Sequence, residues 1–76
     1  MTFSKWLAKK KRYQTIRSFS LKLGFSQNTI RGWLYRDAQP RLDNLAQIVM
    51  RLSAHGAAQP HEIWAELLPI VEGAQH

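Results

Sequence analysis

A single glycine, Gly24, constrains the fold of this chain more than any other residue. It follows a stretch whose apolar residues recur at helical spacing, and Thr15 stands where it can cap the start of that helix. Two positions after the glycine comes Ser26, which can cap a second helix. Glycine adopts left-handed backbone conformations easily, so between a helix end and a new cap it turns the chain steeply. Residues 15–36 therefore predict two short helices joined by a tight turn.

Each of the two predicted helices has one mostly apolar face. In the first helix this face comprises Ile16, Phe19, Ser20 and Leu23. In the second it comprises Phe25, Ile30, Trp33 and Leu34. The outward face of the second helix carries two amides, an arginine and a tyrosine but no acid: Gln27, Asn28, Arg31 and Tyr35. Amides and arginine can pair with the adenine and guanine edges that the major groove of DNA exposes, so this face is predicted to contact bases.

This stretch resembles the Cro and phage-repressor type of helix-turn-helix, a family of small DNA-binding transcriptional regulators. The family pattern has a small residue, then glycine and an apolar residue, then Ile or Val and a large apolar residue. The matching positions here are Ser20, Gly24, Phe25, Ile30 and Trp33. The chain departs from the pattern twice. Ser20 stands where alanine is usual, and Ile16 stands where many members carry a glutamine that touches phosphate.

The resemblance implies a set of DNA contacts. Gln27 and Asn28 are expected to contact bases, and Arg31 is expected to replace Gly32, which occupies the family's next base-contacting position. Contacts to phosphate are expected from residues around the second helix and the loop after it: Arg17, Lys22, Ser26, Thr29, Tyr35, Arg36, Arg41 and Asn44. The implied fold is all-α, a compact five-helix bundle resembling the lambda-repressor-like DNA-binding domain, in which helices 2 and 3 form the helix-turn-helix.

The rest of the chain also has helical spacing of apolar residues. A first helix is predicted over residues 3–12, capped by Thr2 or Ser4. A fourth is predicted from an apolar face of Leu42, Leu45, Ala46, Val49 and Leu52, ending between Ser53 and Gly56.

A fifth helix is predicted from Pro60, with Pro69 ending or kinking it near Leu68. The 76 residues predict one domain with a core of about residues 3–70 and a flexible tail over 72–76.

The net charge of +6 is unevenly divided. Residues 1–36 carry nine Lys and Arg and no acid, whereas residues 37–76 carry two Arg and five acids, or −3. A chain polarised in this way has one side suited to a polyanion. The basic run at residues 9–12 has two equally weighted interpretations. It could contact phosphates, or it could be a solvated helix end, where cations interact favourably with the negative end of the helix dipole.

Several classes of function find no support in the sequence. The chain has no cysteine, and its histidines, His55, His61 and His76, lack the spacing of metal ligands. No phosphate-binding glycine loop, nucleophile motif or paired acids point to an enzyme. We therefore expect no catalysis, cofactor, metal or small-molecule ligand. No apolar run is long enough to span a bilayer, and a cytoplasmic, nucleoid-associated location is expected.

Together these features predict a sequence-specific regulator of transcription that binds duplex DNA. Because the chain is short, we expect it to repress by occluding an operator. The fifth helix has more apolar surface than a small core needs, which predicts a homodimer, in solution or only on DNA. The expected interface residues are Trp64, Leu67, Leu68 and Val71, although Trp64 could instead cap the monomer core. Two alternatives are an antitoxin, excision or transposition factor with the same DNA-binding domain, and a protein-interaction module whose basic face meets an acidic partner.

Overall fold

Five α-helices make up the computed structural model, which describes residues 2–56 and 58–74. They are α1 (Phe3–Lys11), α2 (Ile16–Leu23), α3 (Gln27–Tyr35), α4 (Leu42–His55) and α5 (Pro60–Ala74). Over the described residues there is no strand, so the predicted all-helical class is confirmed. No helix in the described part of the chain has the length and apolar character needed to cross a membrane.

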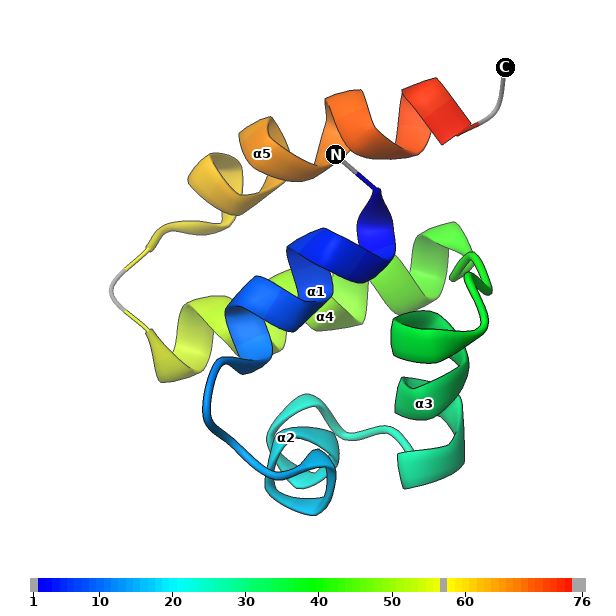
Figure 1. The fold of residues 1–76 in the computed structure, drawn as a ribbon. Coiled ribbons are helices and arrows are strands. Elements are labelled where there is room, and N and C mark those ends of the chain that lie inside the picture. The colour runs from blue at the N-terminus through cyan, green and yellow to red at the C-terminus, as the bar shows by residue number, and fades with distance from the viewer. Residues whose placement is uncertain (1, 57, 75–76) are drawn as a thin grey trace.

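The helices pack around one core (Figure 1). α1 contacts both α3 and α5, and α4 contacts both α2 and α5. α5 lies at one end of the molecule, α2 and α3 lie towards the other, and α1 and α4 lie between them. The buried apolar residues come from all five helices: Phe3, Trp6, Leu7, Phe19, Leu23, Ile30, Trp33, Leu45, Ile48, Val49, Ile63 and Leu67.

The first helix begins at the earlier of its two candidate caps. The Thr2 hydroxyl oxygen accepts a hydrogen bond from the Lys5 backbone N–H at 3.3 Å, as an N-cap side chain does. The Ser4 hydroxyl instead lies 2.6 Å from the Trp33 carbonyl oxygen, where it donates to one of the free carbonyls at the end of α3. Ser4 therefore links α1 to α3 across the core.

The turn between α1 and α2 contains a strained residue. Arg12 has φ 53° and ψ −121°, a backbone conformation that glycine adopts far more readily than a residue with a Cβ. The Gln14 N–H donates to the Lys11 carbonyl at 3.1 Å and closes the turn around it. The helix before this turn therefore ends at Lys11, one residue earlier than predicted.

The apolar face of α4 differs from the predicted face. Leu45 and Val49 are buried as expected, and Ile48, which the prediction omitted, is fully buried with them. Leu42 is 72% exposed and Ala46 is also exposed, so these two residues lie outside the core. The stripe that faces the core follows the buried positions 45, 48 and 49 and the half-buried position 52. At the first turn of α4, Leu42 and Asp43 remain exposed.

Pro69 was predicted to end or kink α5, and the predicted ending is wrong because the helix continues to Ala74. Proline lacks the N–H that would bond to the Ala65 carbonyl. Both residues are exposed, so solvent can satisfy that carbonyl and the helix tolerates the missing bond. Of the predicted tail over 72–76, residues 72–74 are helical, and residues 75 and 76 lie outside the described residues.

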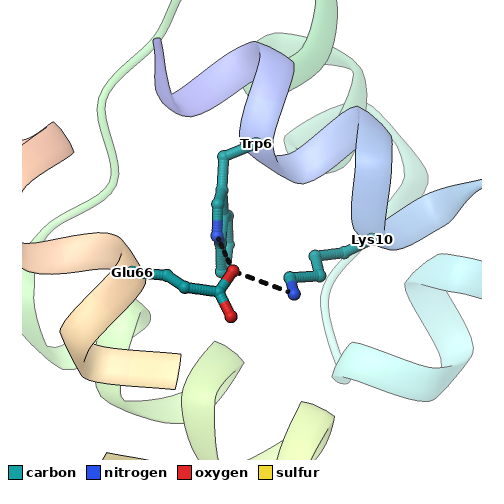
Figure 2. Close-up of polar contacts among 3 residues, drawn as sticks. All are labelled: Trp6, Lys10 and Glu66. Atoms are coloured by element: carbon teal, nitrogen blue, oxygen red, sulfur yellow. Dashed lines mark hydrogen bonds and ion pairs between the residues drawn. The ribbon is translucent and has the colours of Figure 1, made fainter. Parts of the chain in front are cut away.

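A group of three side chains fastens α5 to α1 (Figure 2). The Trp6 indole N–H donates to Glu66 Oε1 at 3.2 Å, and Lys10 Nζ lies 3.1 Å from the same oxygen. Lys10 Nζ also lies 5.5 Å from the centre of the Trp6 ring, within range of a cation–π contact. The hydrogen bond from Lys10 holds the pKa of Glu66 below its ordinary value, with further contributions from the Trp6 hydrogen bond and the Lys10 charge.

Candidate nucleic-acid interface

The turn at Gly24 has the backbone conformation that the sequence predicted. Gly24 has φ 80°, in the left-handed region, and its N–H and that of Phe25 both donate to the Ser20 carbonyl, at 2.8 and 3.1 Å. These two hydrogen bonds to one carbonyl end α2 and direct the chain towards α3. Ser20 is 4% exposed, and its hydroxyl donates to the Arg17 carbonyl at 2.8 Å. A small side chain is therefore buried where α2 meets its neighbours, with its polar atom satisfied.

Two residues of α4 hold this turn, and the sequence did not predict either. Gln47 Nε2 lies 3.0 Å from the Leu23 carbonyl oxygen and 3.4 Å from that of Gly24, and donates to these groups at the end of α2. The Arg51 guanidinium lies close by, 3.6 Å from where a Cβ on Gly24 would stand. The Gln47 hydrogen bonds fix the end of α2 against α4, and the positive charge of Arg51 lies near the negative end of the α2 dipole.

The inner face of α3 is anchored by aromatic contacts. Ile30 and Trp33 are buried, and Trp33 packs edge-to-face against Phe25 with ring centres 4.8 Å apart and against Phe3 at 6.2 Å. Edge-to-face packing restricts the rotation of the rings as well as burying them. The rotation of α3 about its own axis is therefore set by the core.

In this orientation of α3, the side chains expected to contact bases lie mostly on the outer face of the helix. Asn28 and Arg31 are exposed, and Tyr35 is 68% exposed. Their spacing of three and four residues places them on one face of α3. Gln27, the first residue of the helix, is half-buried. The structure thus brings an amide, a guanidinium and a phenol together on a face free of acids.

Of the expected phosphate-binding hydroxyls, that of Ser26 caps α3 and that of Thr29 bonds to it. Ser26 Oγ accepts a hydrogen bond from the Thr29 N–H at 3.1 Å, and the two side-chain hydroxyls lie 2.8 Å apart. Ser26 is exposed and Thr29 is half-buried. The predicted cap is confirmed, and the positive end of the α3 dipole opens to solvent beside Gln27 and Asn28.

Most of the expected phosphate-contacting cations lie on or beside α2 and α3. Arg17, Arg36 and Arg41 are exposed, and Asn44 is half-buried in the first turn of α4. Over the described residues, the ion pair found is that between Lys10 and Glu66, so these three arginines are not neutralised by an ion-pair partner. The positive charge near α3 therefore remains available to an external anion.

Lys22 lies apart from this group. It lines a groove of about 690 Å³ with basic residues from the end of α1 and with the end of α4, where His55 lies. The basic run contributes Lys9, Lys10 and Arg12 to the same groove. Because the C-terminal ends of α1, α2 and α4 have negative dipoles, cations here stabilise the helix ends.

The structure buries one of the four expected dimer-interface residues and leaves the other three at least partly exposed. Leu67 is fully buried in the core of its own chain, so its prediction as an interface residue is wrong. The reason is that α5 turns Ile63 and Leu67 inward to pack against α1 and α4. The other three expected interface residues, Trp64, Leu68 and Val71, are at least partly exposed. They line a groove of about 420 Å³ together with Glu72 and with residues at the start of α4. The full lining is Pro40, Arg41, Leu42, Leu45, Trp64, Leu68, Val71 and Glu72.

Across the described residues, no group of three His, Asp or Glu side chains is placed to hold a metal ion. No known protein family, curated protein or solved structure matches this chain.

Proposed function

We propose that this protein is a sequence-specific regulator of transcription that binds duplex DNA through α3 and represses by occluding an operator. The observation that carries the proposal is the outward face of α3. It presents Asn28, Arg31 and Tyr35 next to a turn fixed by Gly24. In the major groove an asparagine can bond both N6 and N7 of adenine, and an arginine both O6 and N7 of guanine.

The shape of this region supports insertion of α3 into a groove. A major groove about 12 Å wide admits one α-helix with its side chains. α2 and α3 lie at the end of the molecule away from α5, so α3 can approach a duplex without α5 in the way (Figure 1). We propose that α2 and α3 form a helix-turn-helix of the lambda-repressor-like type, with α3 as the recognition helix.

The distribution of charge supports the same orientation. α2 and α3 contain Arg17, Lys22 and Arg31 and no acid, whereas three of the five acids lie on α5. A polyanion is therefore attracted to the α2–α3 side and repelled from the α5 side. We assign the base contacts to Gln27, Asn28 and Arg31 and the principal phosphate contacts to Arg17 and Arg36, whereas Arg41 also lines the groove between α4 and α5.

The first test is selection of preferred duplexes from a random pool by the wild-type protein, followed by affinity measurements at several salt concentrations. With about 4–6 phosphates neutralised, the slope of log affinity against log salt is expected to be about −4 to −5. No enriched sequence, or a slope near zero, would refute the proposal.

The second test removes one base contact. Asn28→Ala is expected to weaken binding to the selected duplex by about 1–3 kcal/mol and to change affinity for random DNA little. Gln59→Ala is the matched control, because Gln59 is an exposed amide just before α5 and away from α3. An equal loss on selected and random DNA would make Asn28 a backbone contact instead.

A further inference from the structure

Gly32, which is half-buried, lies on α3 beside the exposed residues Asn28, Arg31 and Tyr35. It is four residues after Asn28 and three before Tyr35, so its missing side chain leaves a gap between theirs. A glycine within a helix weakens it relative to alanine, because glycine loses more conformational freedom on folding. The position therefore carries a residue that is unfavourable for the helix itself.

The fold does not require glycine at this position. Gly32 is not among the residues with positive φ, unlike Gly24. A Cβ added to Gly32 would meet one neighbouring atom within 4 Å, the Ala38 Cβ at 3.8 Å, which is an ordinary van der Waals contact. Alanine would therefore fit and stabilise α3.

The space that the missing side chain of Gly32 leaves is bounded by apolar atoms. Its floor is the Cα of Gly32, and the methyl group of the exposed residue Ala38 lies to one side. The apolar group that DNA projects into the major groove is the C5-methyl of thymine, which side chains recognise by apolar contact.

We infer that Gly32 is a specificity-determining residue, whose missing side chain admits the methyl group of a thymine against the backbone of α3. This inference rests on the proposed function and specifies part of the target. Four residues of helix span about 6 Å, and successive base pairs lie about 3.4 Å apart. The thymine therefore stands one or two base pairs from the adenine that Asn28 contacts.

The experiment uses the duplex selected by the wild-type protein and versions in which each thymine in turn is replaced by deoxyuridine, which lacks only the methyl group. For the wild-type protein, one replacement next to the Asn28-dependent adenine is expected to weaken binding about fourfold, the effect of exposing one buried methyl group.

Gly32→Ala supplies the complementary measurement. Its added methyl group competes for the space of the thymine methyl, so it should bind the thymine duplex about tenfold more weakly than wild type. On the deoxyuridine duplex at that one position, the two proteins should bind within about threefold of each other, because either methyl group alone fits. The variant should also melt at a higher temperature than wild type.

Ala8→Gly is the matched control, an exchange between the same two residue types at an exposed position of α1. It should lower the melting temperature and leave DNA affinity unchanged, separating helix stability from contact with DNA. The inference is overturned if Gly32→Ala binds the thymine duplex as tightly as wild type, or if its loss is the same on every deoxyuridine duplex. Failure to enrich any duplex would refute the proposed function itself, whereas these two outcomes would leave it intact.

Discussion

Gly24 and Gln47 together fix the direction in which the chain leaves α2. A Cβ on Gly24 would stand 2.9 Å from Gln47 Nε2, closer than real Cβ contacts allow. The same nitrogen bonds to the Leu23 carbonyl. The missing side chain of Gly24 thus serves two purposes, since it permits the positive φ and leaves space for the amide of Gln47.

Gly24→Ala is expected to destabilise the protein by about 2–3 kcal/mol. About 1–2 kcal/mol comes from the left-handed backbone and about 1 kcal/mol from displacing the Gln47 hydrogen bond. Gln47→Ala alone should cost about 1 kcal/mol. In the double variant the two losses should overlap by about 1 kcal/mol, because one hydrogen bond is counted in both. Urea unfolding of the four proteins measures this, and simple addition of the two effects would contradict the assigned contact.

Residues whose roles depend on near neighbours could be predicted from the sequence. The caps Thr15 and Ser26 each accept a bond from three residues ahead, and the turn at Gly24 depends on residues within one helical turn. Gln47 and Ser4 could not be predicted, because the carbonyls that they bond lie 24 and 29 residues away in the sequence. Nothing in the spacing of either residue distinguishes it from a solvated polar side chain.

The contact between α1 and α5 depends on one carboxylate with two donors. Trp6 is 2% exposed, and its indole N–H has Glu66 as its hydrogen-bond acceptor. The Lys10–Glu66 ion pair is half-exposed, with side-chain exposures of 30% and 51%, and pairs of this kind contribute little on their own. The hydrogen bond to Trp6 is therefore expected to stabilise the contact more than the ion pair does.

Glu66→Ala should destabilise the protein by about 1–3 kcal/mol, since it leaves a buried donor without a partner. Glu66→Gln should cost less, because the amide oxygen can still accept from Trp6. Thermal unfolding followed by circular dichroism compares the variants. An equal loss in both would mean that the charge on Glu66, and not its bond to Trp6, holds α5 in place.

The pH dependence of stability follows from the lowered pKa of Glu66. The folded protein binds this proton less tightly than the unfolded chain, so the stabilisation is complete above the ordinary pKa of 4.5. It is lost as the pH falls through the pKa of the folded state. The advantage of wild type over Glu66→Gln should therefore shrink on acidification below pH 4.5, and a constant difference would contradict the assignment.

Errors in the predicted elements have a common physical origin in α5. Spacing of apolar residues identified the helix, but could not tell which part of a broad apolar surface faces inward. Leu67 is buried and Leu68 is 44% exposed, although both are leucines in the same turn. The choice depends on where α1 and α4 lie, which is a tertiary property. Pro69 was likewise judged by its local effect, which solvent exposure makes tolerable.

At the scale of the whole molecule, apolar residues and charge are unevenly distributed. The groove between the start of α4 and α5 is lined by the exposed residues Leu42 and Leu68 and by Trp64, and α5 lies at the end of the molecule away from α2. A second copy that binds here would keep the two basic α2–α3 regions apart, as two half-sites on one duplex require. We propose that dimerisation through this groove accompanies binding to DNA.

Leu68→Glu is expected to abolish the complex of two proteins on a two-half-site duplex and to leave binding to a single half-site unchanged. Leu68 is exposed enough for the fold to survive a charge, which circular dichroism would verify. Met50→Glu is the control, because Met50 is 62% exposed on α4, does not line this groove, and undergoes the same change in charge. Sedimentation with each duplex gives the stoichiometry. Tight two-to-one binding by Leu68→Glu would exclude the groove as the interface.

The overall class and the order of the helices followed from the sequence because each helix has its own caps and apolar spacing. The contacts of α1 with α3 and α5 did not follow from the sequence, because they depend on distant residues such as Trp6 and Glu66.

That last contact has a consequence for how the protein is made. Trp6 and Glu66 are 60 residues apart, and at roughly 5–20 residues per second a ribosome needs about 3–12 s to add the second after the first. During that interval the side of α1 that contacts α5 has no helix to cover it. Closure of the core over α1 therefore waits until α5 has been synthesised.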